Sequence, residues 1–370
     1  MTLNLIADGD IATTALVRQA LGATTRSEIS PLYPRTVRYA DLVSAPSVFS
    51  RFSDPDFEWL PRYLVEHGGR YAYYLDDDFW SLDAASPLGR HYAQPAVRRS
   101  LANFITAAAV VIASTKHLAS QLSARFPSAR VVHIPAHFDF SLLRVESLQG
   151  EPSSTLRIGY AGGFRKEEFA MLTPALERVL ASGKATVEFI GSMPSELNNL
   201  AGVGFFPHIQ DYGEYIRFKR SRKWDIGLAP LIESEFSRSK TNNKFREYGA
   251  LAIAGVYSDV GPYRDSVING ADGILVDNTS DAWLGAISGL IDDPAKRRTL
   301  GLNAQAKIRG NWSLDVLAPR WRDVLDSAHL KSMESQVLGS AQFALRSRRY
   351  RAQRRSTAVV RRALGAVRGM

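Results

Sequence analysis

The chain has 370 residues, of which 45% are hydrophobic and 22% charged, and its formal net charge is +9. Length and composition predict a globular protein of two or three domains with sizeable cores. The absence of cysteine excludes disulfide bonds and thiolate metal sites. The start lacks the basic segment and long apolar run of a secretory signal, and no apolar run approaches a membrane span in length. We therefore expect a cytoplasmic protein.

The positive charge is concentrated at the C-terminal end. Residues 331–370 hold ten Lys and Arg and one acid, which leaves 36 basic and 36 acidic residues in 1–330. One interpretation of this tail is a solvated, weakly ordered terminus. Another is a peripheral anchor on anionic lipid at the inner membrane face, because apolar side chains recur there at helical spacing, at Val360, Ala363, Leu364 and Val367. Nucleic-acid binding is disfavoured, because the neutral body shows no basic groove that would continue the tail.

Two α/β units are expected in chain order. In the first unit, residues 1–150, strands alternate with helices, which predicts a parallel sheet. Its expected strands are 3–7, 41–48, 71–75, 109–114 and 130–135, and its expected helices are 11–21, 95–107 and 115–126. A seam rich in Ser, Gly, Pro and acid covers 139–155.

The second unit, residues 151–330, restarts the same alternation. Its expected strands are 156–163, 185–191, 202–206, 226–231, 253–257 and 273–276. Its expected helices are 168–182, 211–222, 241–250, 262–269, 280–291, 294–308 and 313–328. The residues from 331 onward are expected to form a separate basic tail, which is amphipathic in the membrane interpretation and weakly ordered in the other.

Residues 225–293 are the most informative about function. An apolar strand there is followed by a loop and a helix start that carry Lys240 and Lys244, and the same helix carries Glu247. The spacing i, i+4 places the two lysines on one helix face. Strand, cationic loop, helix and strand are typical of a doubly wound sheet that binds an anionic ligand at its carboxyl edge.

Glycines and acids follow two further expected strands. Gly162 and Gly163 let the backbone approach a ligand closely, and the helix after them offers free N–H groups to a phosphate; a plain tight turn is the alternative. The acids Asp76, Asp77 and Asp78 follow an aromatic strand. We expect Asp76 or Asp77 in the site, binding substrate hydroxyls or acting as a base. In the alternative, one acid caps the next helix and the others are solvated.

The second half of the chain resembles the donor-binding domain of GT-B glycosyltransferases, in the large retaining group called family 4. The resemblance spans about 156–326 and rests on four spaced pieces, YAGGFRK at 160–166, then 240–256, 263–276 and 293–304. It implies an α/β fold of two doubly wound, Rossmann-like domains that face a central cleft. It also implies a nucleotide-sugar co-substrate with no essential metal and no other cofactor.

The residues themselves suggest which side chains contact the donor. Arg165 and Lys166 are expected to neutralise the diphosphate of the donor, and at least one of Lys240 and Lys244 to contact it; an exposed, solvated pair of lysines is the alternative. Fixed cations there stabilise the leaving nucleoside diphosphate more in the transition state than in the ground state. The resemblance implies that Glu247 holds the ribose hydroxyls; a helix ion pair with Lys244 or Lys240 is the alternative. We count Asp76, Asp77, Arg165 and Lys240 as the candidate catalytic residues.

Two departures from the family pattern concern acids and a histidine. Many members carry a second Glu eight residues before the ribose Glu, where this chain has Ser239, and Glu235 is out of register. The family often has a His where this chain has Asp76 to Asp78. A metal-binding D-x-D at these acids belongs to the other glycosyltransferase fold, so no metal site is expected.

Other polar and aromatic residues near the expected cleft are less specific. Tyr212 and Tyr215 stack on the nucleotide base or pack in the core. His133 and His137 are expected to make packing or hinge contacts.

These observations predict transfer of a sugar from a nucleotide-diphosphate donor to a saccharide or lipid-linked acceptor. Retention of anomeric configuration and a place in cell-surface polysaccharide or glycan assembly follow from the resemblance. One alternative is a GT-B nucleotide-sugar epimerase, which needs no acceptor. Another is a non-catalytic nucleotide-sugar-binding or scaffold protein.

Overall fold

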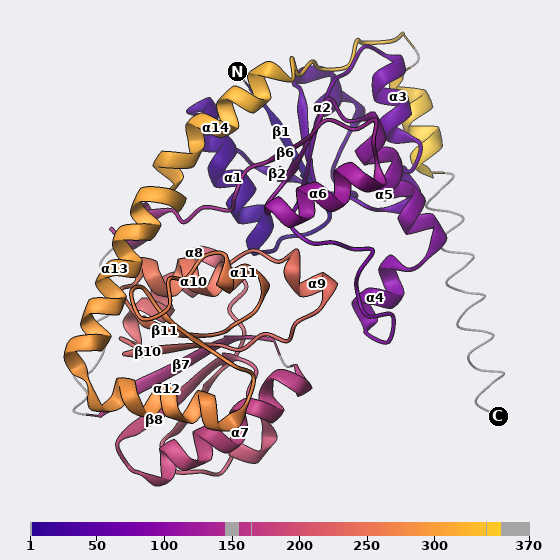
Figure 1. The fold of residues 1–370 in the computed structure, drawn as a ribbon. Helices are drawn as coiled ribbons and strands as arrows, with labels where there is room; N and C mark the ends of the chain where they lie inside the picture. The colour runs from indigo at the N-terminus through magenta and orange to yellow at the C-terminus, as the bar shows by residue number, and fades with distance from the viewer. Residues whose placement is uncertain (1, 145–154, 164, 338, 349–370) are drawn as a thin grey trace, which may run out of the picture.

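The computed structural model describes residues 2–144, 155–163, 165–337 and 339–348. It forms two lobes, each built around a six-stranded sheet that helices cover (Figure 1). Every strand pair in both sheets is parallel. The α/β class and the two doubly wound units are therefore confirmed.

The sheet of the first lobe has the strand order β2-β1-β3-β4-β5-β6. Its strands are β1 (Asn4–Ala7), β2 (Pro31–Leu32), β3 (Ser47–Ser50), β4 (Ala72–Leu75), β5 (Val110–Ala113) and β6 (Val131–His133). Its helices are α1 (Ala12–Thr25), α2 (Tyr39–Ser44), α3 (Leu60–Glu66), α4 (Pro87–Tyr92), α5 (Pro95–Ala107) and α6 (Lys116–Arg125), with short 3-10 turns η1 (Pro55–Phe57) and η2 (Phe140–Leu143).

The central strands β4 and β5 are buried along their whole length. Parallel strands that are covered on both faces read as continuous apolar runs, which is why AYYL and VVIA are recognisable in the sequence. Two tyrosine hydroxyls that are buried here have backbone partners: Tyr71 donates to the Phe104 carbonyl at 2.8 Å and Tyr73 to the Phe52 carbonyl at 2.9 Å.

The sheet of the second lobe has the order β12-β11-β10-β7-β8-β9. Its strands are β7 (Leu156–Gly162), β8 (Ala185–Gly191), β9 (Val203–Phe206), β10 (Ile226–Ala229), β11 (Ala254–Ser258) and β12 (Ile274–Val276). Its helices are α7 (Lys166–Ala181), α8 (Tyr212–Ser221), α9 (Glu235–Arg238), α10 (Asn243–Ala250), α11 (Gly261–Arg264), α12 (Ser280–Asp292) and α13 (Pro294–Trp312), with a 3-10 turn η3 (Ser195–Leu197).

The last long helix, α14 (Leu314–Ser327), packs on the first lobe, although the chain reaches it from the second (Figure 1). Trp321 stacks on Tyr74 of β4 with ring centroids 5.6 Å apart, and Leu325 joins the core around Leu5. The expected second unit, 151–330, includes these residues, but they pack on the first lobe. The predicted boundary at 150/151 falls within 145–154, outside the described residues.

The two chain segments that pass between the lobes lie side by side. The Phe138 N–H donates to the Trp312 carbonyl at 2.7 Å, and the Leu314 N–H donates to the Phe138 carbonyl at 3.0 Å. Residues 138 and 313 thus form a parallel bridge. The lobes are joined by one paired connection.

The beginning of the basic tail is docked on the first lobe. Lys331 exchanges two backbone hydrogen bonds with Arg70, and residues 339–348 are helical. Phe343 of this segment is buried, with its ring centroid 5.5 Å from that of Trp59 in an edge-to-face contact. The apolar side chains at 360–367, on which the membrane interpretation rests, lie outside the described residues. Among the residues the structure describes, no helix combines the length and hydrophobicity needed to cross a membrane.

The expectation of a strand at 41–48 is wrong. Residues 39–44 form α2, because Asp41 accepts a hydrogen bond from the Arg38 N–H at 2.7 Å and so caps the helix start. The helix ends before Pro46, and the strand follows at β3. The expected helix at 262–269 is also shorter, since α11 covers Gly261–Arg264.

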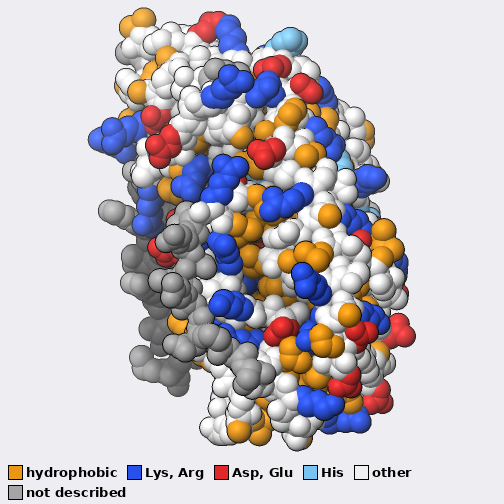
Figure 2. Space-filling view, turned by 90° about the vertical axis from the view of Figure 1, so that its left-hand side faces the viewer, with side chains coloured by type: hydrophobic (Ala, Val, Ile, Leu, Met, Phe, Trp, Pro, Cys, Tyr) orange, Lys and Arg blue, Asp and Glu red, His pale blue; other side chains and the backbone are white. Residues whose placement is uncertain are grey.

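Charge on the surface is mixed on the face that carries α13 and α14. Figure 2 shows Lys and Arg side chains across the middle of this face, interspersed with hydrophobic and acidic ones. The charges of this face therefore do not form one continuous stripe of a single sign.

Candidate functional site

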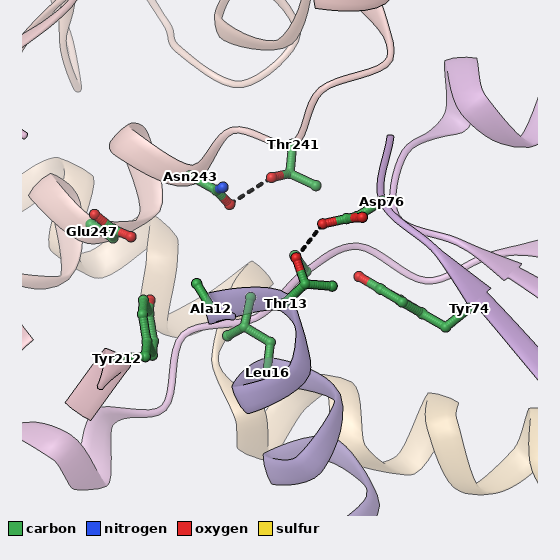
Figure 3. Close-up of a pocket in the computed structure, with 10 residues that line it drawn as sticks. Ala12, Thr13, Leu16, Tyr74, Asp76, Tyr212, Thr241, Asn243 and Glu247 are labelled. Atoms are coloured by element: carbon green, nitrogen blue, oxygen red, sulfur yellow. Dashed lines mark hydrogen bonds between the residues drawn. The ribbon is translucent and has the colours of Figure 1, made fainter. Parts of the chain in front are cut away.

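A cavity of about 310 Å³, counting space open to solvent, lies between the two lobes. We call it the interlobe cavity. Figure 3 shows its lining residues, with Glu247 and Tyr212 on one side and Asp76, Thr13 and Tyr74 on the other. The full lining is Ala12, Thr13, Leu16, Tyr74, Asp76 and Ala136 from the first lobe and Tyr212, Thr241, Asn243 and Glu247 from the second.

A second, larger space of about 1270 Å³, again counting space open to solvent, borders the same loop and reaches the paired connection. Thr241 lines both spaces, and Lys240 lines the larger one. The segment just before α10 therefore lies between the two cavities. This is the segment that the sequence singled out as a cationic loop.

Glu247 is buried at the wall of the interlobe cavity, in α10. Its Oε2 accepts hydrogen bonds from Lys219 Nζ at 2.5 Å and from the Tyr215 hydroxyl at 3.0 Å. Burial by itself would raise the pKa of Glu247, but the Lys219 ammonium outweighs it, so the pKa lies below its ordinary value. Among the described residues the ion-pair partner of Glu247 is Lys219 of α8, and not Lys244 or Lys240 as the alternative had it.

Tyr212 forms part of the same wall. It is buried, lines the interlobe cavity and hydrogen-bonds Glu247. Its ring centroid lies 6.1 Å from that of Tyr215. The two tyrosines and Lys219 follow each other at spacings of three and four along α8, so one face of this helix supports Glu247.

Lys244, in the first turn of α10, lies close to the end of β7. Its Nζ lies 5.2 Å from the ring centroid of Tyr160 and only 3.3 Å from where a Cβ would stand on Gly162. Gly162 thus leaves room for the ammonium group. Burial lowers the pKa of Lys244 to about 8. Gly163, next along the chain, is exposed, with nothing within 4 Å of a Cβ placed there.

Arg165 and Lys240 are close enough to affect each other. Burial and the Arg165 charge lower the pKa of Lys240, and Asp77 across the cleft opposes them. Arg165 is the N-cap residue of α7, with its Nε 3.5 Å from Glu168 Oε1. Lys166, in the first turn, is exposed. The start of α7 and the Lys240 loop thus contribute cations to one region.

The acids after β4 are held by Arg51, which follows β3. Arg51 Nη1 donates to Asp76 Oδ1 at 2.9 Å and to Asp77 Oδ2 at 3.2 Å. The other oxygen of Asp76 accepts a hydrogen bond from the Thr13 hydroxyl in α1 (Figure 3). Burial and the neighbouring Asp76 raise the pKa of Asp77. Asp76 is the acid that lines the interlobe cavity.

Asp78 has a different place. It is buried and accepts hydrogen bonds from the Trp80 N–H at 3.0 Å and the Ser81 hydroxyl at 2.6 Å. These bonds close the turn after β4. Asp78 therefore closes a turn and caps no helix, because the N-cap of the next helix, α4, is Ser86. Asp76 and Asp77 are held by Arg51, so the alternative of one helix cap and two solvated acids is wrong.

Ser239, at the position of the family's upstream Glu, is buried at the contact between the lobes, where its carbonyl accepts a hydrogen bond from Thr115.

The two histidines singled out in the sequence lie near the same region. His137 is buried, and its Nε2 is 3.3 Å from Gln19 Oε1. Its carbonyl accepts a hydrogen bond from Arg246. Burial and Arg246 lower the pKa of His137 to about 3. His133 lines the larger space.

Several residues of the site were not singled out from the sequence. These are Thr13, Arg51, Lys219, Thr241, Asn243 and Arg246. The spacing of Tyr212, Tyr215 and Lys219 was the one available signal, since it places a lysine on a tyrosine-bearing helix face. Nothing in the local sequence around Arg51 indicates that it reaches the acids after β4. Within the described ranges, no three His, Asp or Glu side chains cluster in a way that could hold a metal ion.

No family model and no curated protein sequence matches the chain. In structure it is similar to sucrose-phosphate synthase from Thermosynechococcus elongatus, with 14% identity and a TM-score of 0.64, over 89% of this chain and 99% of that one. It is also similar to Anabaena HepE in complex with UDP-glucose, with 14% identity and a TM-score of 0.63, over 88% and 100%. A third likeness is to OtsA, with 11% identity and a TM-score of 0.60, over 88% and 99%. Likenesses at this identity show the fold alone, and they confirm that the chain has the GT-B fold.

Proposed function

We propose that the protein is a glycosyltransferase that moves a sugar from a nucleoside-diphosphate donor to a saccharide or lipid-linked acceptor. The observation that carries the proposal is a buried Glu247 at the wall of the interlobe cavity with a neighbouring row of cations, in which Lys244 interacts with Glu247, Lys240 with Lys244, and Arg165 with Lys240. The solved GT-B neighbours that bind UDP and UDP-glucose support the choice of a nucleotide-sugar as donor.

Each group has a chemical task in this proposal. Glu247 accepts hydrogen bonds from the ribose, and Tyr212 contributes to the same wall. The cations offset the negative charge that grows on the diphosphate as the bond to the sugar breaks, and this lowers the barrier. The start of α7 offers backbone N–H groups to the same diphosphate.

Asp76 faces this arrangement from the first lobe. Because Arg51 and Thr13 hold both of its oxygens, the carboxylate has a fixed orientation at the cavity. In that position it accepts hydrogen bonds from hydroxyl groups of the donor sugar or the acceptor. Contact of the two lobes excludes water from the cleft, so that hydrolysis does not compete with transfer.

The finer parts of the proposal are retention at the anomeric carbon, a family 4-like relationship and action on cell-surface glycans. Retention is tested by following the anomeric proton of the product by NMR in a single turnover. Cytoplasmic residence with peripheral binding at the inner membrane face is proposed through residues 331–370. Its test is co-sedimentation of the full chain with anionic and with neutral vesicles, repeated after removal of 349–370.

A thermal-shift panel tests the donor class. UDP-, GDP-, ADP- and dTDP-sugars are offered to the wild type and to Lys240→Ala, with Lys184→Ala as a matched exposed lysine. The proposal expects one donor to raise the melting temperature of the wild type and of Lys184→Ala but not of Lys240→Ala. If no nucleotide-sugar stabilises the wild type, the proposal fails.

Nucleotide release with and without acceptors then separates three activities. A glycosyltransferase releases nucleoside diphosphate faster when its acceptor is present. An epimerase turns over its nucleotide-sugar without an acceptor, and a non-catalytic binding protein is stabilised by a donor but never releases the diphosphate.

A further inference from the structure

Lys219 is a fully buried lysine behind the wall of the interlobe cavity. Its ammonium group is 2.5 Å from Glu247 Oε2, and among the described residues it has no other carboxylate partner. Tyr215 donates to the same oxygen at 3.0 Å. Neither Lys219 nor Tyr215 lines the cavity, whereas Glu247 does. Two donors of α8 that do not line the cavity therefore hold one oxygen of the carboxylate.

The ammonium group is itself fixed in place. It lies 4.3 Å from the ring centroid of Tyr215 and 5.2 Å from that of Tyr248. Two aromatic faces and one carboxylate leave little freedom for a side chain that is normally flexible. Burying an ion pair of this kind is no requirement for stability, because apolar side chains of similar volume fill such a site at least as well. Its contact with Glu247, which lines the cavity, gives the ion pair a role other than stability.

We propose that Lys219 is a positioning residue that turns Glu247 toward the ribose and thereby selects ribonucleotide donors over 2′-deoxyribonucleotide donors. The inference rests on the proposed function and deepens it by naming the substrate class. When one oxygen of a carboxylate is held by hydrogen bonds, the orientation of the whole group is fixed. Such a carboxylate can accept hydrogen bonds from the two neighbouring hydroxyls of a ribose. A 2′-deoxyribose lacks one of these hydroxyls, so the buried carboxylate loses a hydrogen bond that water does not replace.

The test compares ribo and deoxyribo forms of one nucleotide on the full chain. UDP, GDP and ADP are titrated by calorimetry, and the one that binds is compared with its 2′-deoxy form. For the wild type we expect a preference of about tenfold or more for the ribose form, since a hydrogen bond to a charged group is lost. In Lys219→Met the preference is expected to fall below about threefold, while Lys296→Met, an exposed lysine of α13, keeps it.

Two further variants show whether Lys219 acts through Glu247. Glu247→Gln and the double variant Lys219→Met/Glu247→Gln are expected to have the same low preference, because the lysine has nothing left to position. Tyr215→Phe removes one hydrogen bond to Oε2 and keeps the charge. It is expected to fall between the wild type and Lys219→Met.

The pH dependence gives a readout that a purely structural role would not move. The charged and titratable groups that face Glu247 are Lys219, Tyr212 and Tyr215 of α8, Lys244, Arg246 and Tyr248 of α10, and Tyr263 of α11. Without Lys219, burial raises the pKa of Glu247 and the carboxyl binds a proton. Binding of the ribonucleotide by Lys219→Met should therefore recover as the pH is raised, whereas the wild type shows no such recovery.

The outcomes are distinguishable. If the wild type binds no nucleoside diphosphate, the proposed function itself is overturned. If the wild type binds one without a ribose preference, or Lys219→Met keeps the preference, the role of Lys219 is overturned while the proposed function stands. If Lys219→Met does not fold, Tyr215→Phe decides: a reduced preference supports the inference and an unchanged one overturns it.

Discussion

Thr115 donates a hydrogen bond from Oγ1 to the backbone carbonyl of Ser239, at 3.1 Å, and so joins the two lobes directly beside Lys240. The same Oγ1 accepts a hydrogen bond from the Leu118 N–H at 3.1 Å and caps α6. One hydroxyl thus ties the start of a first-lobe helix to the cationic loop of the second lobe. This contact holds the residue before Lys240 against the first lobe.

The environment of Ser239 predicts that the missing upstream acid does not fit this chain. Ser239 is fully buried, and its hydroxyl has no partner in the described part of the structure. Ser239→Glu is expected to destabilise the protein by several kcal/mol, because an unpaired charge would be buried. Ser239→Ala should change the free energy of unfolding by less than about 1 kcal/mol. Urea unfolding measures both, and an equally stable Ser239→Glu protein would contradict the prediction.

Arg165 is expected to act on the leaving diphosphate. Arg165→Ala should lower kcat by about 10²-fold or more, because a cation that stabilises developing charge is lost. Arg178→Ala removes an exposed arginine of the same helix, paired with Asp281 at 3.1 Å, and should leave kcat unchanged. Steady-state kinetics with the donor identified by the thermal-shift panel compares the two. Equal kcat values in both variants would remove Arg165 from the site.

The acids after β4 are expected to separate into a catalytic and a structural role. Asp76→Asn should lower kcat by about 10²-fold, since Asp76 lines the interlobe cavity as a fixed carboxylate. Asp78→Asn should lower the free energy of unfolding by about 1 kcal/mol through the weakened turn, with kcat nearly unchanged. Activity per folded molecule and urea unfolding measure the pair. The reverse pattern would exchange their roles.

Lys244 predicts a loss of nucleotide affinity at alkaline pH. Its pKa in the folded protein is about 8, against an ordinary value of 10.5. Above pH 8 the free protein loses this charge, so the Kd of the nucleoside diphosphate should rise with pH. Lys244→Arg keeps its charge and should show no such rise. Titrations from pH 7 upward test this, and a flat wild-type profile would contradict it.

Raising the pH weakens nucleotide binding through Lys244, but the same deprotonation is expected to increase the stability of the folded protein. Because its folded pKa is depressed, the folded protein binds fewer protons than the unfolded chain between pH 8 and 10.5. The contribution of Lys244 to stability therefore increases with pH across that window. Comparing the pH dependence of urea unfolding in wild type and Lys244→Met isolates it.

The docked segment before residue 349 is expected to contribute to the stability of the first lobe. Phe343 is buried between Trp59 and Tyr39, so Phe343→Ala should cost about 3 kcal/mol of unfolding free energy. Leu345, two residues on, is 69% exposed, and Leu345→Ala should change the unfolding free energy by less than about 0.5 kcal/mol. A Phe343→Ala protein as stable as the wild type would show that the docking is not maintained in solution.

The strands could be predicted from the sequence where burial leaves a continuous apolar run, as at Ala72–Leu75 and Val110–Ala113. The strand expected at 41–48 could not, because Asp41 forms a helix cap there that an apolar pattern does not reveal. The lobe on which α14 packs could not be predicted either. The spacing of its apolar residues shows that one face of the helix is buried, but it does not show which lobe covers that face.

For the site, the sequence indicated side chains at strand ends and helix starts. The structure places Glu247 at the interlobe cavity, and Lys240 at the neighbouring larger space and close enough to Arg165 to be affected by its charge. The sequence did not indicate the side chains that hold the site residues in place. Lys219 is 28 residues from its partner, and Arg51 is 25 residues from Asp76. Pairings of this kind depend on how separate elements pack together, and they cannot be predicted from the residues on either side of each partner.

The bridge between residues 138 and 313 limits how the lobes can move. Two crossing segments that are hydrogen-bonded to each other resist twisting and sliding, while bending across them remains easy. The lobes should then open and close by a hinge motion about a single axis. Fewer open arrangements exist than for lobes on a free linker, so closing around a substrate forfeits less conformational entropy.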